Sequence, residues 1–154
     1  MKEENKKSDS LISLFETKKS LTITLLRARE SLMMSFRPML AKHNFTEQQW
    51  RVLRVLGEKG PCDAGQLATE ACILSPSLSR IINTLIENNF ITKKEDKLDK
   101  RKIILDISDE GKLKLETIKP EYLAILKSIQ KRYGEDKINK ILSLLTEVID
   151  WRSR

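Results

Sequence analysis

The residues whose types and spacing could do chemistry lie in the segment from Ser75 to Ser108. Its first half predicts a helix, because Ser75 suits the N-cap and Pro76 suits the first helical position. Apolar residues recur there at three- and four-residue spacing and form one face. The other face combines one cation with short hydrogen-bonding side chains, which suits close approach to DNA base edges and phosphates. The DNA contacts predicted on this helix are Pro76, Ser77, Ser79, Arg80 and Asn83.

A charged ribbon of two strands is predicted directly after this helix, from Phe90 to Ile107. Its cations outnumber its acids, and cations that neutralise phosphates supply most non-specific affinity for DNA. The alternative interpretation is a solvated hairpin whose lysines bind nothing. Because the ribbon adjoins the helix, we expect a recognition helix followed by a wing. The predicted cationic contacts of the wing are Lys93, Lys94, Lys97, Lys100, Arg101 and Lys102.

Composition limits the classes of function that this chain can have. Its 154 residues carry a net charge of +7, which favours a polyanionic partner where the charge is localised. One histidine, no clustered carboxylates and no glycine-rich phosphate loop predict no enzyme and no catalytic residue. The spacing of Cys62 and Cys72 matches neither a disulfide framework nor a zinc site, so no metal or cofactor is expected. With neither a secretory signal nor a membrane-length apolar run, we expect a cytoplasmic protein.

Two further helices are predicted in front of the recognition helix. The first has a capping box, in which Thr46 and Gln49 satisfy each other's backbone N–H groups. The second starts at Asp63 in the same way and ends a few residues before Ser75. Two short helices joined by so tight a connection form a helix-turn-helix. We therefore expect a winged helix-turn-helix over residues 46–107.

Long amphipathic helices are predicted on both sides of this module, over residues 20–43 and 109–152. They are longer than the module needs for its own core, so we expect their surplus apolar faces to pack against a second copy of the chain. The resulting homodimer would present two recognition helices to a pseudo-palindromic site on double-stranded DNA. The expected organisation is a flexible tail over 1–18 and one domain over 19–154, mainly α with a small β-wing.

The sequence resembles the MarR family of dimeric transcriptional regulators. The residues that carry the resemblance are LATEACILSPSLSRIINTLIENNFI (67–91) and DKRKIILDISDEGK (99–112), and the likeness extends from about Ser20 onward. Within the family, the chain is similar to the regulators of homoprotocatechuate-degradation operons. The resemblance implies that Arg101, at the wing tip, enters the DNA minor groove and that Asp99 orients it. A narrow minor groove attracts a planar guanidinium, which agrees with this role.

The resemblance also implies a small-molecule pocket where the first, second and fifth helices meet. An aromatic acid there would need arginines for its carboxylate and an apolar wall for its ring. The candidate ligand residues are Arg27, Arg29, Ser35, Arg37, His43, Trp50 and Arg51. Two of them have simpler interpretations: Trp50 suits a staple with Phe45 in the core, and His43 suits a helix C-terminus.

The function that these residues and the resemblance together imply is a dimeric transcriptional regulator, acting as a repressor that a small phenolic or aromatic carboxylic acid relieves. One alternative is a regulator without a small-molecule ligand, controlled by its abundance or by oxidation. Against the oxidation alternative, Cys72 is expected to pack in the core of the helix-turn-helix, with Cys62 as a small staple residue. The other alternative is a winged helix that binds protein, although such a wing would not need Arg101.

Overall fold

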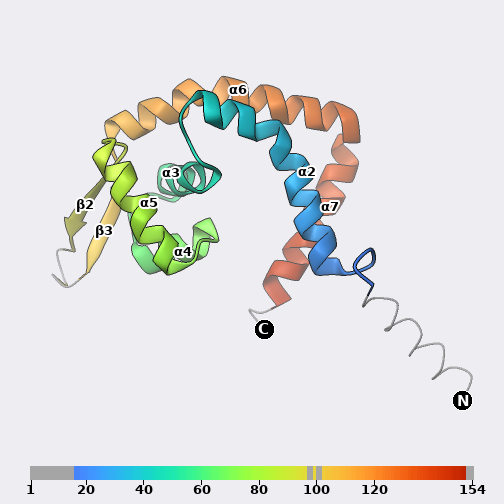
Figure 1. Cartoon of the computed structure of the whole chain (residues 1–154), viewed down its shortest axis with the longest axis horizontal. Helices are drawn as coiled ribbons and strands as arrows, with labels where there is room; N and C mark the ends of the chain where they lie inside the picture. The colour runs from blue at the N-terminus through green and yellow to red at the C-terminus, as the bar shows by residue number, and fades with distance from the viewer. Residues whose placement is uncertain (1–15, 97–98, 100–101, 152–154) are drawn as a thin grey trace, which may run out of the picture. The chain divides into compact units, whose positions relative to one another are not determined.

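The computed structural model describes residues 16–96, 99 and 102–151, in two compact units that meet between Pro38 and Met39. The first unit holds most of α2 (Leu21–Lys42), and the second holds its last turn and all later elements (Figure 1). These elements are α3 (Glu47–Lys59), β1 (Cys62–Asp63), α4 (Ala64–Ala71), α5 (Ser75–Glu87), β2 (Ile91–Glu95), β3 (Ile103–Ile107), α6 (Asp109–Tyr133) and α7 (Glu135–Asp150). The predicted class, mainly helical with a small β-wing, is confirmed.

The predicted capping boxes of α3 and α4 are both present. At the start of α3, the Thr46 side chain accepts from the backbone N–H of Gln49, and the Gln49 side chain accepts from that of Thr46. Asp63 and Gln66 make the same reciprocal pair at the start of α4. These side chains satisfy backbone donors that a helix leaves unpaired, so both helices begin at the predicted residues.

The turn between α4 and α5 differs from the prediction in two respects. The N-cap of α5 is Leu74 and not Ser75, because the Leu74 carbonyl accepts from the backbone N–H groups of Ser77 and Leu78. The prediction that Cys72 packs in the core was also wrong. Cys72 is the C-cap of α4 in the left-handed conformation, with φ of 50°, and its side chain is exposed. A backbone that reverses direction at Cys72 turns the side chain away from the core.

The sheet has three antiparallel strands in the order β1-β3-β2. The hairpin of β2 and β3 was predicted, and it pairs Ile91 with Ile107 and Lys94 with Ile104. The strand β1 was not predicted and pairs Cys62 with Leu105 along the other edge of β3. Because β1 has only two residues, no alternation of apolar and polar side chains could mark it.

The core of the second unit is built by the apolar faces of its helices and of the sheet. Leu53, Leu67, Leu78, Leu105 and Ile118 are each at most 2% exposed. Removing a buried leucine from such a core typically costs about 2–5 kcal/mol, so these contacts hold the helix-turn-helix and the wing as one body. The core therefore fixes where the outward faces of α5 and the wing lie.

The helices α6 and α7 leave much apolar surface exposed. The Ser108 side chain caps α6, which continues through Pro120 to Tyr133. No residue of α7, all of which the structure describes, is buried. Exposed apolar side chains on these helices include Leu113, Leu123, Leu126, Ile141, Leu142 and Ile149. Within the described ranges, no helix is long and apolar enough to cross a lipid bilayer.

Candidate nucleic-acid interface and ligand pocket

The outward face of α5 carries the side chains predicted to contact DNA. Leu78, Ile81 and Leu85 point into the core, each less than 9% exposed. The predicted contacts on the opposite side are all exposed: Pro76, Ser77, Ser79, Arg80 and Asn83. The helix thus presents one guanidinium among short polar groups, with no acidic side chain before Glu87. This surface can approach a groove of DNA without repelling the phosphates.

The wing adds exposed lysines beside this helix. Lys93 and Lys94 on β2 are exposed, as is Lys102 just before β3. The hairpin is closed near its tip by two backbone bonds, from Asp96 N–H to the Lys102 carbonyl at 2.9 Å and from Lys102 N–H to the Asp99 carbonyl at 2.8 Å. Asp99 is half-buried, and its own N–H donates to the Asp96 carboxylate at 2.8 Å. The other predicted wing contacts, Lys97, Lys100 and Arg101, lie outside the described residues.

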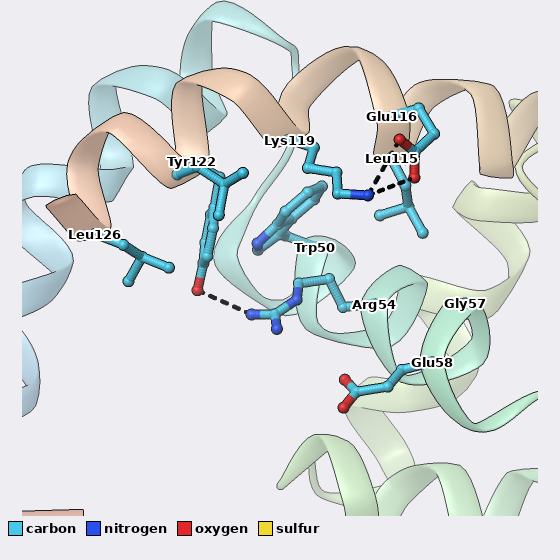
Figure 2. A pocket seen from close by; sticks show the side chains of 10 residues that line it. Trp50, Arg54, Gly57, Glu58, Leu115, Glu116, Lys119, Tyr122 and Leu126 are labelled. Atoms are coloured by element: carbon cyan, nitrogen blue, oxygen red, sulfur yellow. Dashed lines mark hydrogen bonds and ion pairs between the residues drawn. The ribbon is translucent and has the colours of Figure 1, made fainter. Parts of the chain in front are cut away.

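A pocket of about 410 Å³ lies between α3 and α6 (Figure 2). Its volume falls within the range of small-molecule sites. Helical spacing of i, i+4, i+7 and i+8 brings four α3 residues onto its wall, and α6 supplies the other side. The lining residues are Trp50, Arg54, Gly57, Glu58, Leu115, Glu116, Lys119, Tyr122, Leu123 and Leu126.

Three side chains converge on one end of the pocket (Figure 2). The Arg54 guanidinium donates from Nη1 to the Tyr122 hydroxyl at 2.9 Å and lies 4.9 Å from the centre of the Tyr122 ring. The indole of Trp50 packs 5.8 Å from the same ring and is only 6% exposed. Its Nε1 is buried and has no hydrogen-bond partner among the described residues. A buried N–H without a partner costs about 1–3 kcal/mol, so the Trp50 indole keeps an unused donor at this end of the pocket.

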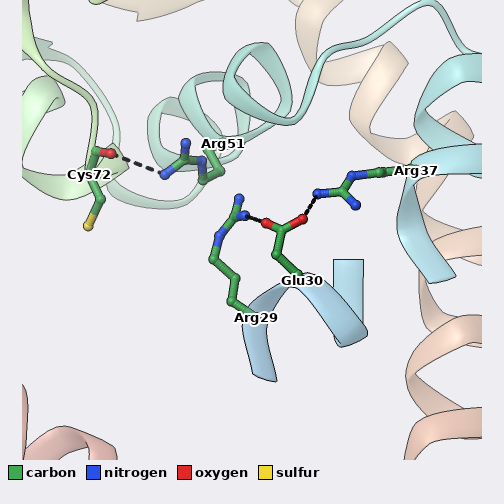
Figure 3. Close-up of polar contacts among 5 residues, drawn as sticks. All are labelled: Arg29, Glu30, Arg37, Arg51 and Cys72. Atoms are coloured by element: carbon green, nitrogen blue, oxygen red, sulfur yellow. Dashed lines mark hydrogen bonds and ion pairs between the residues drawn. The ribbon is translucent and has the colours of Figure 1, made fainter. Parts of the chain in front are cut away.

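Two of the four ligand residues predicted on α2 before Pro38 share a carboxylate. Arg29 donates to one carboxylate oxygen of Glu30 at 2.7 Å, and Arg37 donates to the other (Figure 3). Arg27 and Ser35 are exposed on the same helix. Within the first unit, two of the three predicted arginines are therefore engaged by one carboxylate.

His43 and Arg51 make contacts elsewhere in the second unit and do not line the pocket described above. His43 Nε2 lies 2.9 Å from Glu121 Oε1, which also accepts from Lys42 at 3.0 Å. Hydrogen bonds from Lys42 and then His43 hold the pKa of Glu121 below its ordinary value of 4.5. Arg51 Nη1 donates to the carbonyl oxygen of Ala71 at 2.7 Å. It also donates to the carbonyl oxygen of Cys72 at 3.2 Å (Figure 3).

Of the predicted ligand residues in the second unit, Trp50 alone lines this pocket. Its packing against Phe45, with ring centres 6.1 Å apart, also confirms the predicted staple. Arg54 and Tyr122 were missed by the sequence reasoning. Arg54 could have been found, because it follows Trp50 by one helical turn and shares its face. Tyr122 resembled an ordinary member of the apolar face of its helix.

Comparisons with known proteins identify the family of this chain. The MarR family model matches residues 45–103. The homoprotocatechuate degradative operon repressor of Escherichia coli is 35% identical over 130 residues, which cover 84% of this chain and 88% of that protein. The transcriptional regulator FarR of Neisseria gonorrhoeae is 37% identical over 129 residues, with the same two coverages.

One solved structure has the same fold as this chain. The structure of NadR in complex with 4-hydroxyphenylacetate is similar to this chain with a TM-score of 0.76 and 37% identity. The match covers 84% of this chain and 92% of NadR. The chain has the helix-turn-helix and the wing, and its relatives are similar to it over most of its length. It therefore belongs to the MarR family.

Proposed function

We propose that this chain is a cytoplasmic, dimeric transcriptional repressor that binds duplex DNA through α5 and the wing. The observation that carries the proposal is the exposed face of α5, with Arg80 among short polar side chains beside an exposed pair of lysines on β2. In this proposal Ser77, Ser79, Arg80 and Asn83 contact bases or nearby phosphates. The wing cations, with Arg101 at the tip, contact the flanking backbone and minor groove.

The dimer in this proposal uses the long helices on either side of the winged helix-turn-helix. Residues 19–154 act as one functional domain, in which 20–43 and 109–152 supply the contacts between copies. The exposed apolar side chains of α6 and α7 support this part of the proposal, because an extended apolar surface favours burial against a partner. Two copies would present two recognition helices about one turn of DNA apart.

The effector in this proposal is a small phenolic or aromatic carboxylic acid, bound in the pocket between α3 and α6. Its carboxylate accepts hydrogen bonds from the Arg54 guanidinium and, when side chains shift to uncover it, from the buried, unpartnered Nε1 of Trp50. Its ring packs beside Tyr122 and the leucines of α6. The names of two relatives support this chemistry: a repressor of homoprotocatechuate degradation, and NadR bound to 4-hydroxyphenylacetate.

A titration of fluorescently labelled DNA tests the proposal as a whole. The labelled duplex carries the region upstream of the protein's own gene, and a scrambled duplex of equal length is the control. We expect tight, salt-dependent binding to the first duplex, and we expect 4-hydroxyphenylacetate to weaken it. Equal binding to both duplexes would refute the proposed operator recognition. Binding unaffected by any phenolic acid, with no thermal stabilisation by one, would favour a regulator without such an effector.

A further inference from the structure

Arg51 joins α3 to the end of α4, directly before the recognition helix. Its Nη1 donates to the carbonyl oxygen of Ala71 at 2.7 Å and to that of Cys72 at 3.2 Å. Figure 3 shows the second of these bonds. Both carbonyl groups are at the end of α4, where they accept no hydrogen bond from an N–H of their own helix. A cation at this end also interacts favourably with the helix dipole. The contact therefore satisfies a helix terminus with a side chain from another helix.

The backbone that Arg51 holds sets the path into α5. Cys72 has a φ of 50°, a conformation that residues other than glycine rarely adopt without support. Only Ile73 and Leu74 separate it from the first residue of α5. A change in the conformation of Cys72 would therefore reorient α5 relative to α4, and with it the face that carries Arg80.

The helix α3 also forms one wall of the candidate ligand pocket. Trp50 and Arg54, on either side of Arg51 in the sequence, both line that pocket. A turn of about 100° per residue places Arg51 on a neighbouring face of the helix, toward α4. Its Nε is buried without a hydrogen-bond partner among the described residues. A small displacement of α3 would therefore change the two hydrogen bonds that Arg51 donates to the turn.

We propose that Arg51 is a positioning residue that fastens the turn before the recognition helix to α3, and so links the ligand pocket to DNA binding. The inference rests on the proposed function, because it assigns a route of regulation to that pocket. A ligand held by Trp50 and Arg54 favours one position of α3, and Arg51 transfers this preference to Cys72 and α5. The ligand acts only through its different affinity for the two positions.

Two substitutions at Arg51 test this role. Arg51→Gln removes the charge and keeps a short amide donor, whereas Arg51→Lys keeps the charge and loses the planar fork. Lys59→Gln, at the exposed end of the same helix and outside the pocket, removes one positive charge and is the matched control. Three quantities are measured for each protein: operator affinity without effector, affinity for 4-hydroxyphenylacetate without DNA, and the factor by which effector weakens operator binding.

We expect Arg51→Gln to lower operator affinity about tenfold, with effector affinity within about twofold of the parent protein. We expect the factor by which effector weakens operator binding to fall toward one. Arg51→Lys should recover part of both losses, and Lys59→Gln should behave like the parent protein. Hydrogen exchange of the amides from Cys72 to Leu78 should be faster in Arg51→Gln, while the core amides of α3 stay protected.

Two results would overturn the assignment. Loss of effector binding by Arg51→Gln, with operator affinity intact, would make Arg51 a ligand contact. Parent-like values of all three quantities in both Arg51 variants would remove any positioning role. If the parent protein itself fails to bind its upstream DNA or to respond to effector, the proposed function fails. If the parent responds and the Arg51 variants match it, only the role of Arg51 fails.

Discussion

Arg54 on α3 lies over the ring of Tyr122 on α6 and donates to its hydroxyl at 2.9 Å. The pair joins the two walls of the candidate pocket beside the unpartnered indole N–H of Trp50. Because the bond is to a neutral phenol, a carboxylate can displace it and gain a charge-assisted bond in its place. The bond to Tyr122 therefore holds the Arg54 guanidinium in the position from which it would bind an anionic ligand.

Substitution of Arg54 should separate ligand binding from folding. Arg54→Met keeps most of the aliphatic stem and removes every donor, so we expect affinity for 4-hydroxyphenylacetate to fall at least about tenfold. Isothermal titration calorimetry measures the affinity. Arg132→Met is the matched control, because Arg132 lies 6.0 Å from the centre of the Tyr133 ring, outside the pocket. Equal losses in both variants would contradict the assignment of Arg54.

Cations that read bases and cations that bind phosphates should respond differently to substitution. We expect Arg80→Ala to lower affinity for the operator far more than for scrambled DNA, because Arg80 lies on the exposed face of α5. Lys94→Ala should weaken binding to both and reduce the salt slope by about one.

Arg101→Ala should weaken operator binding strongly. Small, equal effects of Arg101→Ala and Lys94→Ala would contradict the role predicted for the wing tip.

The two cysteines should differ in reactivity toward iodoacetamide. Burial, and then the carboxylates of Asp63, Glu70 and Asp106, raise the pKa of the Cys62 thiol above its ordinary value of 9.0. Cys72 is exposed at the end of α4. Because the thiolate reacts, we expect Cys72 to be alkylated roughly tenfold faster or more at neutral pH. Peptide mapping by mass spectrometry follows both sites, and faster alkylation of Cys62 would contradict this order.

Glu121 should make the stability of the fold depend on acid. Hydrogen bonds from Lys42 and His43 keep its folded pKa below 4.5, so the unfolded chain takes up the proton first as the pH falls. The stabilisation is therefore complete above that value and is lost as the pH falls through the folded pKa. We expect Glu121→Gln to flatten the acid side of the stability profile, measured by urea unfolding. Glu87→Gln, which removes an exposed carboxylate at the end of α5, should leave that side unchanged.

A side chain at Gly111 should destabilise the fold. A Cβ there would lie 2.1 Å from the Phe90 carbonyl oxygen, a backbone atom that also accepts from the N–H of Ser108. We expect Gly111→Ala to lower the free energy of unfolding by about 1–3 kcal/mol. Gly65→Ala is the control, because its new Cβ would meet only the Asp63 carboxylate, at 3.2 Å. A gain in helix propensity offsets that contact, so its stability should stay within about 1 kcal/mol of the parent protein.

Local signals in the sequence predicted the elements that position the DNA-binding face. The capping residues Thr46 and Asp63 mark where α3 and α4 begin, because each satisfies backbone groups within its own first turn. The apolar spacing of Leu78, Ile81 and Leu85 likewise determines which side of α5 faces outward. Such interactions span three or four residues, so the sequence alone specifies them.

Contacts between distant segments decided the rest. The strand β1 exists because Cys62 meets Leu105, and the pocket exists because Arg54 meets Tyr122, a residue 68 positions later. Arg51 was predicted as a ligand residue, and only the packed helices bring it to the end of α4. The sequence by itself determined the helices, their caps and the outward face of α5. Tertiary structure decided which side chains share a site. The packing of whole helices is the sum of many weak contacts between residues that lie far apart in the sequence.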